Sequence, residues 1–103
     1  YLDAMKYFLR NNPTPAKEYP CIVPNWDTTA RLQRNAVILH GSTPDLFKEH
    51  VKEVLESIKD KDEDDKIVYL KSWNEWAEGN YLEPDATYGY AFLEAIKNAI
   101  RSN

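Results

Sequence analysis

Two glutamates, Glu75 and Glu78, lie three positions apart in a segment rich in aromatic and amide residues, 73–81. If the backbone curls into a turn after Asn74, positions three apart become neighbours, with Cβ atoms about 5–6 Å apart. Two carboxyl groups that close, in a partly dry pocket, differ in proton affinity, so one can hold a proton while the other stays charged. A proton donor beside a base is what the making or breaking of a glycosidic bond requires. In an extended segment the two side chains would instead point to opposite faces.

The residues around the two glutamates favour a carbohydrate ligand. Trp73 and Trp76 offer flat apolar faces on which the C–H face of a sugar ring can rest. Asn74 can donate and accept hydrogen bonds toward sugar hydroxyls, and Gly79 permits a positive φ or a close backbone approach. We therefore predict a catalytic pair of glutamates whose substrate contacts these tryptophan and asparagine side chains.

Other interpretations of these residue types stay open. Glutamates at this spacing occur on many solvated helix faces, and the tryptophans could belong to the core. A polar and aromatic stretch at 25–31 holds further candidates, although an aspartate and an arginine alone more often form a surface pair. The further substrate-binding candidates are Trp26, Asp27, Arg31, Tyr81 and Glu83, of which the last two are ambiguous from residue type.

The first part of the chain predicts a helix and a short strand. Residues 1–10 have a helical pattern that ends at 11–15, where two prolines remove backbone donors and disfavour the helix. Residues 19–24 form an apolar run bounded by prolines, as in a short buried strand. Residues 32–42 are expected to be irregular, with a weak extended piece at 37–39.

A second helix is predicted from residue 44 onward. Thr43 can cap it, Pro44 suits the first turn because its missing N–H is not needed there, and Asp45 complements the positive end of the helix dipole. Apolar residues then recur at spacings of four, three and four, which lines one helix face: Phe47, Val51, Val54 and Ile58. The mixed charges of residues 59–66 predict a solvated turn.

A second strand and a third helix follow. Residues 67–70 are apolar throughout, as in a parallel strand covered on both faces, and the two glutamates come shortly after its end. Thr87 can cap a last helix, and Lys97 and Arg101 suit its negative end. The apolar stripe predicted for this helix comprises Phe92, Ala95, Ile96, Ala99 and Ile100.

The order helix, strand, helix, strand, helix predicts an α/β fold with parallel strands and flanking helices. Two parallel strands alone make a poor domain, because both are edge strands and one of their faces stays uncovered. The same order suits the C-terminal strand–helix units of a TIM-like (β/α)8 barrel, which typically needs about 250 residues. The chain opens without a methionine, on what looks like the tail of a helix, so we expect residues 1–103 to be a single C-terminal fragment of such a domain. A fragment that folds alone would compensate by extra pairing of residues 32–39 or by self-association.

Composition narrows the classes of partner. The formal net charge of -4 argues against a nucleic-acid partner, because proteins that bind a phosphate backbone usually carry a basic face. No apolar run approaches the roughly 20 residues that cross a bilayer, so no membrane span is expected. The single cysteine, Cys21, excludes an internal disulfide and is expected to be a buried apolar residue, and with His40 and His50 it forms no metal-ligand spacing. We expect no metal or cofactor, a cytoplasmic location, and an oligosaccharide or polysaccharide substrate.

Three blocks of the sequence carry a family resemblance. Residues 72–85, with Tyr88-Gly89-Tyr90 after them, resemble the C-terminal signature of the WbsX-type proteins, and residues 24–31 and 41–44 resemble two further blocks of that family. The resemblance covers most of the chain after its first helix. WbsX-type proteins are classed as glycosyltransferases of bacterial surface-polysaccharide gene clusters, so the resemblance implies such a parent protein, of which the C-terminal part is present.

The core Asn-Glu-Trp-x-Glu-Gly at 74–79, with Glu83-Pro84 after it, is also similar to the family 99 glycoside hydrolases. Those enzymes are endo-acting α-mannosidases and α-mannanases on a (β/α)8 barrel, in which both glutamates of the core are catalytic. The resemblance implies that Glu75 is the base that deprotonates a sugar 2-hydroxyl and that Glu78 is the acid that protonates the leaving oxygen, with retention through a 1,2-anhydro sugar. Ala77 stands where the hydrolases commonly have histidine, so one substrate contact is absent or replaced.

The expected function is that of a carbohydrate-active enzyme in bacterial surface-polysaccharide metabolism. Its full-length parent would be a glycosyltransferase or a retaining glycoside hydrolase, depending on whether another sugar or water accepts the glycosyl group. An isolated fragment could keep both glutamates and still lack the walls that bind donor and acceptor. The alternative is a non-catalytic carbohydrate-binding module that stacks sugars on tryptophan and tyrosine, and a third possibility is a purely structural segment.

Overall fold

The fold comes from a computed structural model that describes the backbone of residues 1–11 and 18–102 and the side chains of 1–6 and 18–102. Helix α1 (Leu2–Asn11) confirms the first predicted helix, and the prolines expected to end it, Pro13 and Pro15, lie outside the described residues. In the part of the chain that is described, no helix is long and apolar enough to span a membrane.

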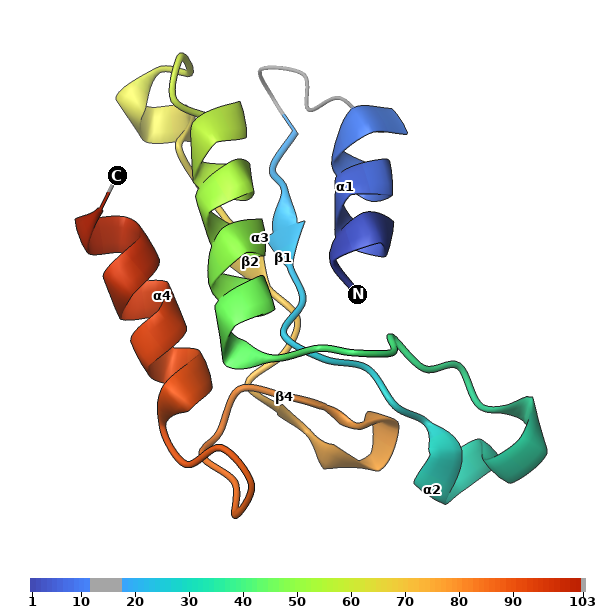
Figure 1. Cartoon of the computed structure of the whole chain (residues 1–103). Helices are drawn as coiled ribbons and strands as arrows, with labels where there is room; N and C mark the ends of the chain where they lie inside the picture. The colour runs from blue at the N-terminus through green and yellow to red at the C-terminus, as the bar shows by residue number, and fades with distance from the viewer. Residues whose placement is uncertain (12–17, 103) are drawn as a thin grey trace.

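Three helices lie side by side on one face of a pair of short strands (Figure 1). Helix α3 (Pro44–Ser57) is the middle one and packs against both α1 and α4 (Ala91–Arg101). Strands β1 (Cys21–Ile22) and β2 (Tyr69–Leu70) pair in parallel behind them. The predicted parallel α/β arrangement is confirmed, although both strands are shorter than predicted, and the barrel to which we assign them stays a prediction.

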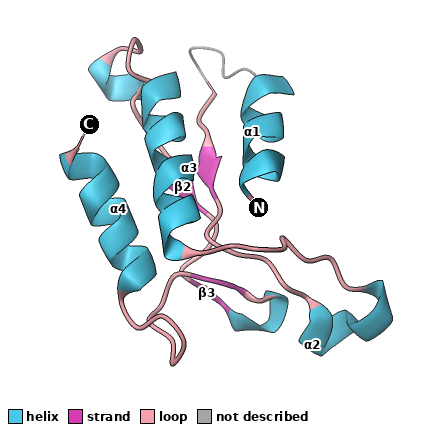
Figure 2. Cartoon of the chain, viewed as in Figure 1, coloured by secondary structure: helices cyan, strands magenta, loops and turns pink. Residues whose placement is uncertain are grey.

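Short elements make up the rest of the described chain, in which helix predominates over strand (Figure 2). Two of these elements, the strands β3 (Asn74–Glu75) and β4 (Asn80–Tyr81), form a separate antiparallel pair. The short elements are the single-turn helix α2 (Thr29–Leu32), the 3-10 helices η1 (Gln33–Asn35), η2 (Glu63–Asp65) and η3 (Trp76–Glu78), and the strands β3 (Asn74–Glu75) and β4 (Asn80–Tyr81).

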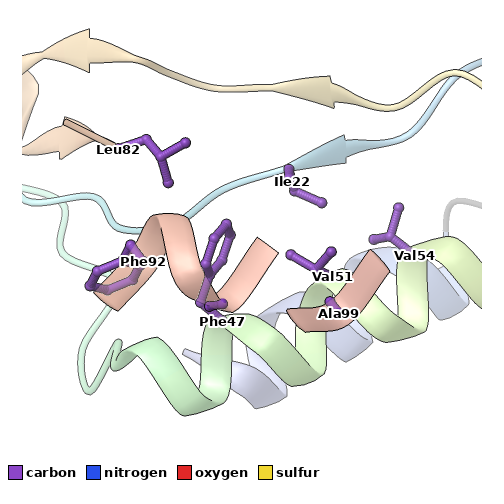
Figure 3. Packing of buried hydrophobic residues seen from close by; sticks show 8 residues of the cluster. Ile22, Phe47, Val51, Val54, Leu82, Phe92 and Ala99 are labelled. Carbon is purple, nitrogen blue, oxygen red and sulfur yellow. The ribbon is translucent and has the colours of Figure 1, made fainter. Parts of the chain in front are cut away.

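The core lies between α3, α4 and the strands. Phe47 of α3 and Phe92 of α4 meet with ring centroids 5.5 Å apart, and Ile22 and Leu82 point toward them from the strand side (Figure 3). Each such side chain stabilises the fold by about 1.5–3 kcal/mol when it is fully buried, so these contacts hold the helices to the strands. The buried cluster comprises Ile22, Phe47, Val51, Val54, Leu82, Phe92, Ala95 and Ala99.

The predicted start and apolar face of α3 are confirmed. Thr43 Oγ1 accepts the Leu46 N–H at 3.2 Å, and Pro44 is the first helical residue. The four predicted apolar residues are all buried. The last of them, Ile58, lies just beyond the end of the helix at Ser57.

The described residues cover only one face of the parallel pair, which corrects two predictions. Side chains alternate along a strand, so Ile22 and Leu70 face the helices while their neighbours Cys21 and Tyr69 face away. Tyr69 is 59% exposed, and Cys21 is exposed as well, contrary to the burial expected for it. The predicted strand at 67–70 is therefore apolar on both faces but covered on one.

The last helix begins later than predicted, because a turn precedes it. Asp85 Oδ1 accepts the Tyr88 N–H at 2.6 Å, and Asp85 and Gly89 form an antiparallel bridge. Thr87 lies inside this turn and is exposed, so the prediction that it caps the helix is wrong. The helix starts at Ala91 without a side-chain cap.

The predicted apolar stripe of α4 is confirmed except at one position. Phe92, Ala95 and Ala99 are buried, and Ile96 is partly buried against the core. Ile100 is 59% exposed. Successive helix residues rotate by about 100°, so Ile100 lies about 100° from Ala99 and falls at the edge of the face that α3 covers.

The charged segment 59–66 is mostly solvated, as predicted, with one exception. Asp65 is 8% exposed, and its Oδ1 accepts the hydroxyl of Tyr19 at 3.0 Å. The prediction is wrong for this residue because the segment before β1, distant in sequence, supplies a donor that permits its burial.

Residues 37–39 form the extended piece predicted there and pair with residues 26–28. The Leu39 N–H donates to Trp26 O at 2.8 Å, and the Thr28 N–H donates to Val37 O at 3.2 Å. This pairing lies beyond the end of β1 and leaves the parallel sheet two-stranded. The turns of α2 and η1, which were expected as loop, fill the segment between the paired residues.

His50 is a buried histidine on α3 whose two ring nitrogens have no hydrogen-bond partner among the described residues. It is 2% exposed and lies edge-on to the ring of Tyr1, with centroids 6.0 Å apart. Burial favours the neutral imidazole and lowers the pKa of His50 from 6.5 to about 4. Protonation of His50 in acid should therefore destabilise the folded state.

We expect the free energy of unfolding to fall as the pH falls from 6.5 to about 4. In that range the unfolded chain binds a proton at His50 that the folded chain does not bind, so stability present above pH 6.5 is lost on acidification. The loss amounts to about 3 kcal/mol, at 1.36 kcal/mol for each pKa unit. Urea unfolding followed by tryptophan fluorescence across this pH range measures it.

His50→Phe is the matched variant, because it keeps an aromatic ring beside Tyr1 and removes the titrating group. Its unfolding free energy should lack this part of the pH dependence, whereas His40→Phe, at an exposed histidine, should retain it. Identical pH dependence in wild type and His50→Phe would contradict the assignment to His50.

Candidate functional site

The segment with the two glutamates lies at the carboxyl ends of the parallel strands. β1 continues into residues 23–39, which include α2, and β2 continues into the hairpin of β3, η3 and β4. Both lie at the same end of the strand pair (Figures 1 and 2). Parallel strands end at a common edge, which is where α/β proteins build their sites. Two loops that are far apart in the sequence therefore meet here.

The hairpin has the curl that we predict after Asn74. β3 ends at Glu75, and η3 makes one 3-10 turn that is closed by a hydrogen bond from the Gly79 N–H to Trp76 O at 3.0 Å. The fully extended backbone that would put Glu75 and Glu78 on opposite faces is thereby excluded. The two glutamates follow β2 at the two ends of a single turn.

Gly79 is where the two loops touch. Its φ of 55° lies in the left-handed region, and a Cβ built on it would lie 2.2 Å from Asp27 O. The Asp27 N–H donates to Glu78 O at 3.0 Å across the same contact. Because both the backbone angle and the space exclude a side chain, this position requires glycine.

The two glutamates differ in their surroundings. Glu75 is exposed, whereas the Glu78 side chain is 27% exposed and its Oε1 lies 3.9 Å from a guanidinium nitrogen of Arg31. Asp27, suggested by residue type as a surface partner of Arg31, turns to its own loop: its Oδ1 accepts the Thr29 N–H at 2.8 Å. Hydrogen bonds from the Thr29 hydroxyl and N–H lower the pKa of Asp27. The carboxylate beside Arg31 is therefore that of Glu78 and not that of Asp27.

The tryptophans of the hairpin are surface residues. Trp73 and Trp76 are 48% and 47% exposed, so the interpretation of these residues as core is wrong. Trp76 stacks on Tyr81, with ring centroids 3.7 Å apart and planes 17° apart. The Tyr81 hydroxyl donates to Asp85 Oδ2 at 2.8 Å, and burial together with the Asp85 carboxylate raises the pKa of Tyr81 to about 12. The phenol therefore stays neutral at physiological pH.

The other predicted contact residues lie at the same end of the strands. Trp26 is half-buried, and the Lys71 ammonium lies 5.5 Å from the centroid of its ring. Asn74 is exposed on β3, and the half-buried Glu83 donates its N–H to Trp73 O at 3.1 Å. Among the described side chains, no group of three or more His, Cys, Asp or Glu residues comes together in a way that could hold a metal ion.

Two asparagines outside the predicted set join the loops from inside. Asn80 is fully buried, and its Nδ2 donates to Asn25 O at 2.7 Å and to Lys71 O at 2.9 Å. Asn25 brackets Tyr81 with its own side chain: Nδ2 donates to Tyr81 O at 3.1 Å, and Oδ1 accepts the Tyr81 N–H at 2.8 Å. Asparagine beside a strand end usually marks an exposed turn, so its sequence position gives little sign of this burial.

Comparison with known proteins identifies the family of the chain. The family model described as Glycosyltransferase WbsX matches residues 1–96, a range that contains every predicted site residue. The chain belongs to this family. The family resemblance expected from the hairpin and the two upstream blocks is therefore confirmed.

The relatives of this WbsX-family chain are much longer than the chain itself. Uncharacterized protein WxcX of Xanthomonas campestris pv. campestris strain B100 is 36% identical over 84 residues, and WxcX of a second strain of the same pathovar shows the same identity. The alignment covers 80% of this chain and 12% of each relative. No solved structure matches the chain at a significant level.

We expect Gly79→Ala to destabilise the WbsX-family chain far more than Gly89→Ala. Both glycines have a φ near 55°, so each alanine costs about 1–2 kcal/mol in left-handed backbone strain. Only at residue 79 does the new Cβ also meet a backbone atom, and nothing lies within 4 Å of it at residue 89. Urea unfolding of the two variants isolates the clash, and equal losses would mean that the loops do not press together at Gly79.

Proposed function

We propose that the full-length parent of this chain makes or cleaves a glycosidic bond in bacterial surface-polysaccharide metabolism, with Glu75 and Glu78 as its base and acid. The observation that carries the proposal is the hairpin after β2. One turn holds both glutamates beside two exposed tryptophans, in a member of the WbsX glycosyltransferase family. Paired carboxyl groups next to flat aromatic faces suit chemistry on a sugar ring.

The uncovered face of the parallel pair supports a (β/α)8 parent. In such a barrel each strand turns one face to the surrounding helices and the other to the interior. Ile22 and Leu70 face the helices here, and Cys21 and Tyr69 lie on the uncovered side. In the proposed parent the remaining strands enclose that side, residues 1–103 form the C-terminal part, and the hairpin lies at the C-terminal face of the barrel, where such enzymes have their sites.

In the proposed mechanism the Glu75 carboxylate takes the proton of a sugar 2-hydroxyl, and O2 closes on C1 to form a 1,2-anhydro sugar. Glu78 gives its proton to the glycosidic oxygen as the bond between C1 and that oxygen breaks. The acceptor hydroxyl then passes its proton to Glu78, its oxygen adds to C1 and opens the anhydro ring, and Glu75 returns its proton to O2. Water as acceptor gives hydrolysis and a sugar hydroxyl gives transfer, with retention in both.

Arg31 lies beside Glu78, the proposed acid, at a position from which it can contact the substrate. Arg31 is 63% exposed and its nitrogen lies 3.9 Å from Glu78 Oε1, a distance at which a surface ion pair contributes little energy. In the proposed enzyme Arg31 leaves this weak contact and binds a polar group of the substrate.

The proposed substrate is an oligosaccharide or a polysaccharide. Its rings would rest on Trp73 and Trp76, which are the exposed aromatic faces of the hairpin. The lone cysteine of the chain suits a reducing compartment, and we place the proposed reaction in the cytoplasm. The contacts to sugar hydroxyls would come from Trp26, Asp27, Arg31, Asn74, Tyr81 and Glu83.

The first test is complementation in the bacterium that encodes the full-length protein, after deletion of its gene. We expect Glu75→Gln and Glu78→Gln each to leave the surface polysaccharide at the level of the deletion strain, because loss of a general acid or base costs about 10²–10⁴-fold in rate. Gel analysis and sugar-linkage analysis of the extracted polysaccharide measure the outcome.

Glu94→Gln is the matched control, because Glu94 is an exposed glutamate on α4, outside the hairpin. It should restore the polysaccharide as wild type does, at equal protein level. Full restoration by both hairpin variants would rule out the acid and base roles, and an unchanged polysaccharide in the deletion strain would rule out the proposed pathway.

A carbohydrate-binding module without catalysis is the second candidate function, favoured by the exposure of Trp73 and Trp76. Titration of the full-length protein with mannose-type oligosaccharides, followed by tryptophan fluorescence and by product analysis, separates the two. We expect Trp76→Ala to weaken binding about fivefold or more, in line with roughly 1 kcal/mol for an aromatic contact. Binding that survives Glu75→Gln and Glu78→Gln, with no product formed by wild type, would favour the module.

A further inference from the structure

Glu75 is exposed, yet its backbone is held from inside the hairpin. The Glu75 N–H donates to Ser72 Oγ at 3.2 Å, and the Ser72 hydroxyl donates to Asn80 O at 2.6 Å. One half-buried hydroxyl thus serves as acceptor for the residue that carries the carboxylate and as donor to the opposite strand. Because its proton is directed at the Asn80 carbonyl, the Ser72 hydroxyl can hold the Glu75 backbone in place.

Asn80, whose carbonyl accepts the Ser72 hydroxyl, has a side chain that is held in one orientation. Asn80 is fully buried, and both hydrogens of its amide are used, one on Asn25 O and one on Lys71 O. These two carbonyls belong to the segments that follow β1 and precede the hairpin, so the Asn80 amide has one orientation in which its donors are satisfied. Ser72 therefore ties Glu75 to the backbone of Asn80, a residue whose side chain is itself fixed by two hydrogen bonds.

Glu78 depends on a different support. Its carbonyl accepts the Asp27 N–H, and its carboxylate lies beside Arg31, so the loop after β1 holds it. Among the described residues, Ser72 forms its hydrogen bonds with Glu75 and Asn80 and not with Glu78. A change at Ser72 should therefore act on one glutamate and leave the other in place.

We propose that Ser72 is a positioning residue for Glu75, anchored through Asn80. The proposal rests on the proposed function, because the aim of the Glu75 carboxylate matters only if it acts on a substrate. A misplacement of about 1 Å in a reacting group can cost as much as 10²-fold in rate. A freed backbone at Glu75 should thus slow the reaction without unfolding the protein.

The test uses Ser72→Ala, Ser72→Thr and Glu75→Gln in the full-length protein. In Ser72→Ala we expect an unchanged thermal midpoint, about fivefold to tenfold faster hydrogen exchange at the Glu75 amide, and about 10-fold to 100-fold less polysaccharide formed in the complemented deletion strain. Ser72→Thr keeps the hydroxyl and should restore both the slow exchange and the polysaccharide. If Ser72 were merely structural, Ser72→Ala would not speed hydrogen exchange at the Glu75 amide, and Ser72→Thr would not restore the polysaccharide.

Ser57→Ala is the matched control for loss of a serine hydroxyl. The Ser57 hydroxyl also donates to a backbone carbonyl, Val54 O at 2.6 Å, but inside α3 and far from the hairpin in sequence. This variant should leave the Glu75 exchange and the polysaccharide as in wild type.

The outcomes distinguish a failure of the role proposed for Ser72 from a failure of the proposed function. If Glu75→Gln abolishes the polysaccharide while Ser72→Ala forms it at the wild-type level, Ser72 does not position Glu75 and the proposed function stands. If Glu75→Gln forms it normally, the proposed function fails and the role of Ser72 fails with it. Loss of folding in Ser72→Ala, or failure of Ser72→Thr to rescue, would show that the serine is structural and overturn the positioning role.

Discussion

The side-chain amide of Asn80 is the interaction on which the arrangement of this site depends. β1 and β2 pair over only two residues each, and beyond that ladder a single backbone hydrogen bond, from the Asp27 N–H to Glu78 O, joins the loops that follow them. The Asn80 amide bridges them by bonding to a carbonyl on each side, at Asn25 and at Lys71. Hydrophobic burial holds α3 and α4 to the strands, but it is non-directional and does not set where a loop ends. Directional hydrogen bonds do that here.

The two glutamates reach the same edge of the fold by different routes. Glu75 is held by its own hairpin, whereas Glu78 is held by Asp27 and Arg31 of the loop after β1, which approaches the hairpin closely at Gly79. Their relative placement is consequently a property of the contact between two loops. The absence of a side chain at Gly79 is what allows that contact to be a backbone-to-backbone one.

The sequence predicts a helix or a turn well where neighbouring residues are sufficient to form it. The Thr43 cap and the apolar spacing of α3 act within one helix, and the curl of the hairpin follows from a few adjacent residues. Features set by distant segments were missed. Cys21 is exposed because none of the described residues covers that side of β1, and Asp65 is buried where Tyr19 supplies a donor. The (β/α)8 assignment concerns strands beyond this pair and stays a prediction.

The same distinction, between features set by neighbouring residues and features set by distant segments, holds for the candidate site. Residue types and spacing were sufficient to single out the glutamates, the tryptophans and Arg31. They did not indicate that Arg31 accompanies Glu78, nor that Asn25 and Asn80 connect the loops, because these contacts form only when segments distant in sequence meet. A polar residue in a turn carries no local mark that distinguishes a buried bridge from a solvated side chain.

The stack of Tyr81 on Trp76 has a consequence for the direction from which a ligand arrives. At a centroid separation of 3.7 Å the phenol covers one side of the indole, so a sugar ring can rest on Trp76 only from the opposite side. The Tyr81 hydroxyl is tethered to Asp85, which keeps the cover from swinging aside unless that bond breaks. The hairpin therefore offers a ligand only one free side of the Trp76 indole.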